Sequence, residues 1–141
     1  MVSGEIGRLA IKGRSTAVLE ASSVGTYSCA GLADGIAKTN QDCAAFAHPF
    51  AKKASSAFFC VFDGHGKQGE VVSQEALNTV YSEYYTSATE GKLTDDPGNA
   101  MAEAFESANL HLKAFVEDED EDELQVDARK SGACCVAVYI E

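Results

Sequence analysis

The chain has 141 residues, of which 45% are hydrophobic, and it carries a formal net charge of −11. A chain of this length and composition can bury a core. The negative charge and the lack of mixed basic and aromatic clusters argue against a nucleic-acid partner. No apolar run approaches the ~20 residues of a membrane span, and the first residues lack a signal-peptide core. We therefore expect a soluble intracellular protein with no membrane span.

Seven consecutive acidic residues, 117–123, hold most of the excess charge and leave −4 for the remainder. Such a run repels itself, so we expect a solvated loop or the frayed end of a helix. Contact with a basic partner is the alternative. The run lacks the spacing of a calcium-binding loop.

Cysteine usage indicates a reducing compartment such as the cytoplasm. The five cysteines are an odd number without C-x-x-C spacing, and three lie in apolar, strand-like runs. We expect them to be small buried hydrophobes with no metal or redox role. They are Cys29, Cys43, Cys60, Cys134 and Cys135.

The first predicted elements are strands. Residues 1–20 are an extension or an edge strand, ahead of a domain over 21–141. Weak alternation predicts a strand over 25–32, and apolar runs predict strands over 43–47 and 57–62.

The third of these strands ends in the most informative motif of the chain, Asp63-Gly64-His65-Gly66. A carboxylate and an imidazole at the end of a buried strand, where the backbone must turn, are typical of a metal-dependent hydrolase. Asp42 begins the preceding strand, and adjacent strands would bring it close to Asp63. The alternative for the motif alone is a tight turn with local hydrogen bonds and glycines at positive φ.

Two consecutive helices and a final strand follow. Residues 70–88 form an amphipathic helix with apolar positions four residues apart, Val72, Ala76, Val80 and Tyr84. Asp96 is the expected N-cap of a second helix that begins at Pro97. Its apolar stripe comprises Met101, Phe105, Ala108, Leu112 and Phe115. A strand over 136–140 completes the pattern, and paired helices between groups of strands indicate an α+β fold. His48 and His111 have no partner in the sequence and are expected to be structural or surface residues.

Three segments, in this order, resemble the metal-dependent protein serine/threonine phosphatases of the PP2C (PPM) family. They are Lys38-Thr39-Asn40-Gln41-Asp42, then 61–66 with Gly69 and Val72-Ser73, then Ser131-Gly132-Ala133-Cys134. The departures from the family are Glu70, where His is frequent, and Ala133 and Cys134, where small hydroxylated residues are common.

The resemblance implies a layered sandwich of antiparallel sheets flanked by pairs of helices. It implies hydrolysis of phosphoserine or phosphothreonine in a phosphoprotein substrate, by water that two Mg²⁺ or Mn²⁺ ions activate. By resemblance, Asp63 bridges the metals, the Gly64 carbonyl ligates one, and Gln41 binds a metal through water, where Glu is commoner.

The resemblance also assigns roles in proton transfer and phosphate binding. Asp42 orients metal-bound water, and His65 is the general acid that protonates the departing oxygen. Many members hold phosphate with an arginine at the position of Ala37. Here the neighbouring Lys38 takes over that task, without the bidentate fork of arginine.

Two further metal-binding aspartates of the family lie beyond the segment that 131–134 matches, and neither appears before Glu141. We therefore expect the N-terminal portion of a phosphatase domain, an incomplete sandwich that is inactive alone. Its expected partner is the missing C-terminal half or another protein subunit. The alternative is a noncatalytic PP2C-like binding or scaffold subunit of a larger assembly.

Overall fold

A computed structural model describes residues 24–114, 127 and 130–141. The predicted extension over 1–20, the acidic run over 117–123 and Phe115 lie outside these residues. The elements, in chain order, are β1 (Leu32–Ala33), β2 (Ile36–Ala37), β3 (Asp42–Ala47), β4 (Ala57–Gly66), α1 (Gly69–Thr89), η2 (Lys92–Thr94), α2 (Pro97–Ala114) and β5 (Ser131–Ile140).

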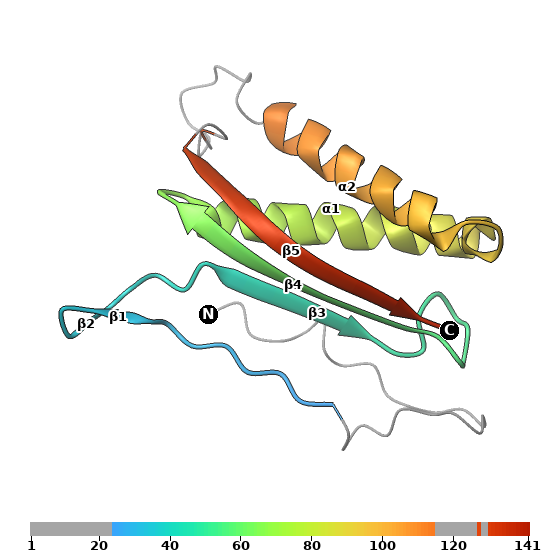
Figure 1. Cartoon of the computed structure of the whole chain (residues 1–141), viewed down its shortest axis with the longest axis horizontal. Helices are drawn as coiled ribbons and strands as arrows, with labels where there is room; N and C mark the ends of the chain where they lie inside the picture. The colour runs from blue at the N-terminus through green and yellow to red at the C-terminus, as the bar shows by residue number, and fades with distance from the viewer. Residues whose placement is uncertain (1–23, 115–126, 128–129) are drawn as a thin grey trace.

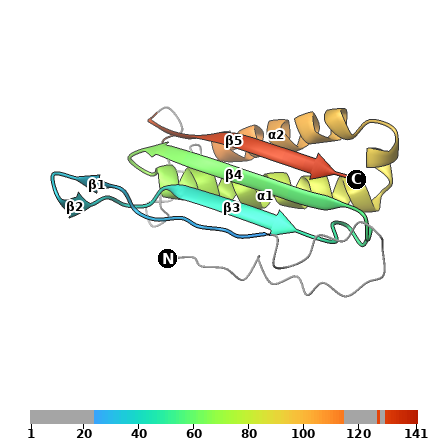
Figure 2. The ribbon, with the colours of Figure 1, turned by 60° about the horizontal axis from the view of Figure 1, so that its bottom comes forward.

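Two antiparallel sheets and two long helices give an α+β fold (Figure 1). β1 and β2 form a small hairpin whose turn residues, Asp34 and Gly35, both have positive φ, at 52° and 79°. Such a two-residue turn suits the twist of a hairpin. The main sheet has the order β3-β4-β5, and both helices cover the same face of it (Figures 1 and 2).

Two strand predictions need correction. Residues 25–31 form no strand, because this glycine-containing segment has no backbone ladder in the described residues, and only Leu32 enters β1. β4 does not end at Phe62. It continues to Gly66, since β5 begins at Ser131 and pairs with all of it. The motif Asp63-Gly64-His65-Gly66 is therefore the last part of a strand. The prediction that the strand ends before the motif was wrong, and so was the alternative that the motif forms a tight turn.

The helix predictions are confirmed, with one shift in the buried stripe. The predicted helix over 70–88 is α1, and the Asp96 side chain accepts a hydrogen bond from the Asn99 N–H at 2.9 Å, as an N-cap does. On α2 the deepest side chains are small, namely Ala100, Ala104 and Ala108. The larger residues of the predicted stripe within the described part of α2 are only half-buried. α2 packs along α1, and small residues allow this close approach.

The core lies between the sheet and α1. Phe58, Cys60 and Phe62 point from β4 into it and are at most 2% exposed. They meet the α1 side chains that sequence spacing placed on one face, including Val80 and Tyr84. The ring centroids of Phe58 and Tyr84 lie 5.3 Å apart.

The other side of the sheet, here called the open face, is covered by neither of the two described α-helices (Figure 2). Residues directly opposite each other in an antiparallel sheet share a face, so register alone defines its apolar members. They are Ala44, Phe46, Ala57, Phe59, Val61, Cys134, Val136, Val138 and Ile140. Val61 and Val136 remain 54% and 69% exposed. Among the described residues, the sheet therefore has one covered face and one apolar face that is largely exposed.

Both histidines outside the motif have structural or surface positions, as predicted. His48 lies in the β3–β4 connection and is 2% exposed. His111 lies on α2, and its Nε2 is 3.6 Å from the Glu75 carboxylate of α1. No helix within the described residues is long and apolar enough to cross a membrane.

Candidate functional site

Asp42 and Asp63 lie directly opposite each other at one end of the β3–β4 pair, on the open face. The Gly64 N–H donates to the Gln41 carbonyl oxygen at 3.1 Å, one residue beyond the pair on each strand. This bond marks Asp42 and Asp63 as a non-hydrogen-bonded pair, the type with Cα atoms about 4.5 Å apart and side chains closest together. Like charges directly opposite in a sheet are destabilising. Two exposed carboxylates are therefore held on the same face at the closest type of cross-strand position.

His65 belongs to the same face, two residues after Asp63. It lies opposite Gly132 of β5. A Cβ atom added to Gly132 would be 2.8 Å from Nε2 of His65 and 2.9 Å from Cε1. The imidazole therefore rests with its Nε2–Cε1 edge over the bare backbone of Gly132, and only glycine leaves room for it there.

Gly64, between the two polar residues, points the other way and is buried against the start of α1. A Cβ atom at Gly64 would be 2.2 Å from the Gly69 carbonyl oxygen and 2.4 Å from that of Gln41. One at Gly69 would be 2.8 Å from the Gly64 carbonyl carbon. The two glycines thus let the first turn of α1 approach the backbone of the motif.

Gln41 connects this end of β3 to β4 and α1. Its carbonyl oxygen accepts from the Gly64 N–H and from the Ser73 hydroxyl, the latter at 2.6 Å. Its side-chain Nε2 donates to the Gly66 carbonyl oxygen at 2.8 Å and to the Glu70 carboxylate at 2.9 Å. Gln41 alone therefore provides hydrogen-bond partners for polar groups of both β4 and α1.

The structure brings together most, but not all, of the residues that the sequence singled out. Asp42, Asp63 and His65 share one end of the open face, and Gln41 and Gly64 adjoin them from the helix side. Lys38 is exposed beyond the β1–β2 hairpin. No hydrogen bond or ion pair between described residues joins its side chain to that end. Residues 24–114, 127 and 130–141 contain no group of three or more metal-ligating side chains placed to hold an ion.

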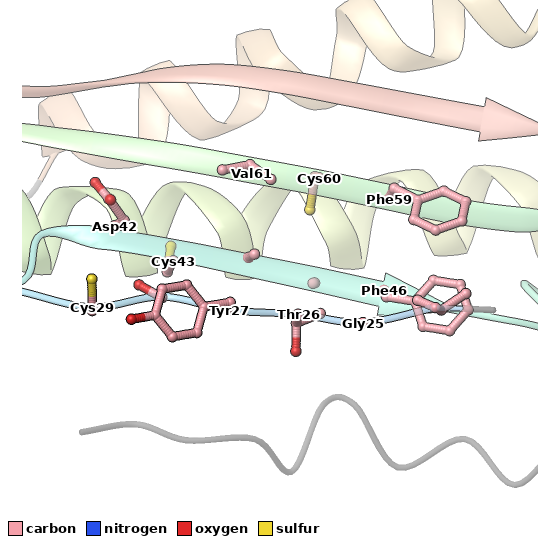
Figure 3. A pocket seen from close by; sticks show the side chains of 14 residues that line it. Gly25, Thr26, Tyr27, Cys29, Asp42, Cys43, Phe46, Phe59, Cys60 and Val61 are labelled. Carbon is pink, nitrogen blue, oxygen red and sulfur yellow. The ribbon is translucent and has the colours of Figure 1, made fainter. Parts of the chain in front are cut away.

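An open pocket of about 660 Å³ runs beside the site. Segment 24–29 forms one wall, and β3 and β4 form the other (Figure 3). Asp42 lies at one end of the labelled side chains, and Phe46 and Phe59, with ring centroids 4.8 Å apart, lie at the other. Apolar atoms dominate the lining, so the pocket continues the apolar open face toward Asp42.

The cysteines are all free thiols, but the prediction that they are buried holds only in part. Cys60 is buried, Cys43 and Cys135 are half-buried, and Cys29 and Cys134 are exposed. Burial raises the pKa of Cys60 to about 12 and that of Cys135 to about 11, because a thiolate loses solvation there. These two thiols stay neutral near pH 7 and are poor nucleophiles and metal ligands.

Sequence reasoning gave no role to three residues that contribute to this region. Glu70 was noted only as a departure from a motif, yet its carboxylate binds the Gln41 amide. Ser73 binds the Gln41 carbonyl, and Gly132 supports His65. Their signal in the sequence is weak, because each acts through a partner at least 29 residues away along the chain.

No protein-family model matches this chain, and no solved structure gives a significant match.

Proposed function

We propose that the chain forms part of a metal-dependent protein serine/threonine phosphatase of the PP2C type. The observation that carries the proposal is the cross-strand pair of Asp42 and Asp63, with His65 on the same face. Like charges directly opposite each other in a sheet repel, and a bound cation would remove this repulsion. Oxygen ligands of this kind suit Mg²⁺ or Mn²⁺.

The bound ions would supply a nucleophilic water and would neutralise charge on the phosphoryl group. In this proposal Asp63 and the Gly64 carbonyl hold metal directly, Gln41 does so through water, and Asp42 orients the water. His65 donates a proton to the departing serine or threonine oxygen, a role that suits an imidazole at neutral pH. Lys38 is the proposed phosphate contact, and it would need the segment around the β1–β2 hairpin to approach the site.

The open face supports the proposed layering. An apolar sheet face with valines about half exposed calls for a covering layer. A second antiparallel sheet, from further residues of the same domain or from another subunit, would cover it and would add carboxylates beside Asp63. A complete two-metal site requires this addition, so the 141-residue chain should have negligible phosphatase activity.

The test of the proposal is to measure Mn²⁺ binding to the 141-residue chain by water-proton relaxation. Few carboxylates bind divalent ions weakly, and we expect a dissociation constant in roughly the millimolar range. Asp63→Asn and Asp42→Asn should each weaken binding about tenfold or more, since each removes a charge next to the ion. Asp95→Asn, which removes an exposed charge after η2, is the matched control and should change nothing. Equal binding by all four proteins would refute the proposed site.

A noncatalytic PP2C-like binding or scaffold subunit is the second candidate, and the extent of the open face favours it. The two candidates differ in what a covering partner brings. With the complementary strands of a phosphatase domain supplied, the first predicts Mn²⁺-dependent hydrolysis of a phosphopeptide that Asp63→Asn abolishes. The second predicts a stable complex without hydrolysis. Hydrolysis by the chain alone, lost in Asp63→Ala, would overturn the expectation that the site is incomplete.

A further inference from the structure

The covered face of the sheet is fully buried on β4 but only half-buried on β5. Phe58, Cys60 and Phe62 of β4 are at most 2% exposed. The β5 residues on the same face are all half-buried, and they are Ala133, Cys135, Ala137 and Tyr139. α2 has a matching half-buried apolar stripe, Met101, Phe105 and Leu112. In both views α2 lies along the outer side of β5, away from β4 (Figures 1 and 2). The two incompletely buried surfaces therefore adjoin each other.

The spacing of helices and strands explains this incomplete burial. The axes of packed helices are about 8–10 Å apart, and neighbouring strands are about 4.8 Å apart. One helix therefore spans about two strands, and α1 and α2 side by side span about four. The described sheet has three strands in the order β3-β4-β5. Beneath α2, beside the outer edge of β5, there is consequently room for one more strand.

The outer edge of β5 offers backbone hydrogen-bonding groups at fixed positions. The bond from the Gly64 N–H to the Gln41 carbonyl oxygen shows that the even-numbered residues of β4 bond to β3. The odd-numbered residues of β4 therefore bond to the even-numbered residues of β5, in a register that is unbroken along the whole of β4. The odd-numbered residues of β5 direct their backbone groups outward, and no described residue pairs with them.

We propose that this edge binds one further β-strand, supplied by an extended segment of another protein with apolar residues at alternate positions. The segment pairs antiparallel with β5, and its apolar side chains pack under α2 against Met101 and Phe105. β5 contains no proline or charged residue, the features that protect many edge strands from pairing.

A second copy of this chain does not fit the same place. Its own α2 would extend over the shared edge, and the two α2 helices would overlap. The bound segment therefore carries no helix on that side. It lies in the plane of the sheet, so it is distinct from a layer over the open face. The inference goes beyond the proposed function, because it needs neither a metal ion nor the Asp63 end of the sheet.

The experiment measures backbone amide hydrogen exchange by NMR, with the 141-residue chain at a concentration where sedimentation shows monomers. The probe is a synthetic peptide as long as β5, with alternating valine and threonine and a lysine at each end. With peptide at about ten times its dissociation constant, the outward amides of Ala133, Cys135, Ala137 and Tyr139 should exchange about tenfold more slowly. Those of Cys134, Val136 and Val138, already bonded to β4, should not change. A peptide of the same composition with its valines grouped together is the control.

Two substitutions test the two parts of the surface separately. Ala137→Pro removes an outward N–H but no bond to β4, and it should weaken peptide binding about tenfold or more. Phe105→Ala removes the largest apolar side chain of the α2 stripe and should also weaken binding about tenfold. Leu110→Gln, at a residue of α2 that is 65% exposed, is the matched control and should bind as the wild type does. Slow exchange of the inner β5 amides shows that each variant remains folded.

Three results would overturn the proposal. Slow exchange of the outward amides in the free, monomeric chain would show that the edge is already covered. No change on adding peptide, or equal changes at odd and even positions or with the control peptide, would show that no strand is added. Protection that rises with the concentration of the chain alone, and is lost in Ala137→Pro, would show that the partner strand is β5 of a second copy.

Discussion

The two faces of the β3-β4-β5 sheet are made by the same strands but differ in almost every physical respect. On β4, Cys60 faces the helices and is 1% exposed, whereas its neighbour Val61 faces the other way and is 54% exposed. The covered face has stacked aromatic rings, among them those of Phe50 and Tyr84. The open face carries apolar residues along most of its length and ends in Asp42, Asp63 and His65.

This difference separates the packed core from the candidate site across a single sheet. The covered face is completed by α1, which follows β4 directly in the chain. The polar residues of the open face lie at the end of the sheet where Gly64 and Gly69 allow α1 to approach closely. Substitutions on the covered face should therefore lower the free energy of unfolding, whereas those on the open face should mainly change association and the site.

The largest effect is expected for Phe58→Ala. Phe58 is fully buried and packs on Tyr84, and truncation of such a ring costs about 3–5 kcal/mol. Its neighbour Phe59 lies on the open face, so Phe59→Ala should cost clearly less, about 1 kcal/mol. Urea unfolding of both variants gives the comparison. Equal losses would mean that the two faces are equally well packed in solution.

Gly64→Ala should come next. Its Cβ would lie 2.2 Å from the Gly69 carbonyl oxygen, and backbone atoms on both sides must move to relieve the contact. Such overpacking costs about 1–3 kcal/mol, and we expect the upper part of this range. Gly25→Ala is the control, because no atom lies within 4 Å of the added methyl group. A thermal midpoint for Gly64→Ala close to that of the control would contradict the tight approach of α1.

Association through the open face should be weaker but measurable. We expect the isolated chain to self-associate or to be partly molten, since its described residues leave an apolar face exposed and pair with neither outer edge of the β3-β4-β5 sheet. Val136→Thr combined with Val138→Thr keeps the shape of both side chains and should weaken association about tenfold in sedimentation experiments. Leu110→Gln, which changes an exposed leucine on α2, is the control. A monomeric wild type with a sharp, cooperative thermal transition would show that the chain completes its own core.

Gly132→Ala should have the smallest effect on stability, less than about 1 kcal/mol, because its contact is the edge of an exposed side chain. The added methyl group must displace the His65 imidazole, whose Nε2 would be 2.8 Å away. The NMR resonances of the His65 ring should shift, and those of the buried His48 should not. Gly98→Ala on α2 controls for the loss of a glycine. Unchanged His65 resonances would mean that the ring does not rest on β5.

The sequence by itself determined the helices and the character of the strands. Four-residue spacing defined α1, and the Asp96-Pro97 pair marked the start of α2, because helix periodicity and capping are local properties of the chain. Alternation could also assign residues such as Cys60 and Val61 to opposite faces. Asp42 and Asp63 could be recognised as strand-end carboxylates, and adjacent strands do bring them together.

Only the tertiary structure decided where β4 ends and what surrounds the motif. Asp63-Gly64-His65-Gly66 looks like a turn when read alone, but pairing with β5, whose residues lie more than 60 positions later, keeps it extended. The same holds for Gln41, Glu70 and Gly132, whose roles arise from contacts with partners far along the chain. Local sequence encodes backbone preference and periodicity. Strand register and the close approach of a helix depend instead on packing between distant segments, which no window of neighbouring residues contains.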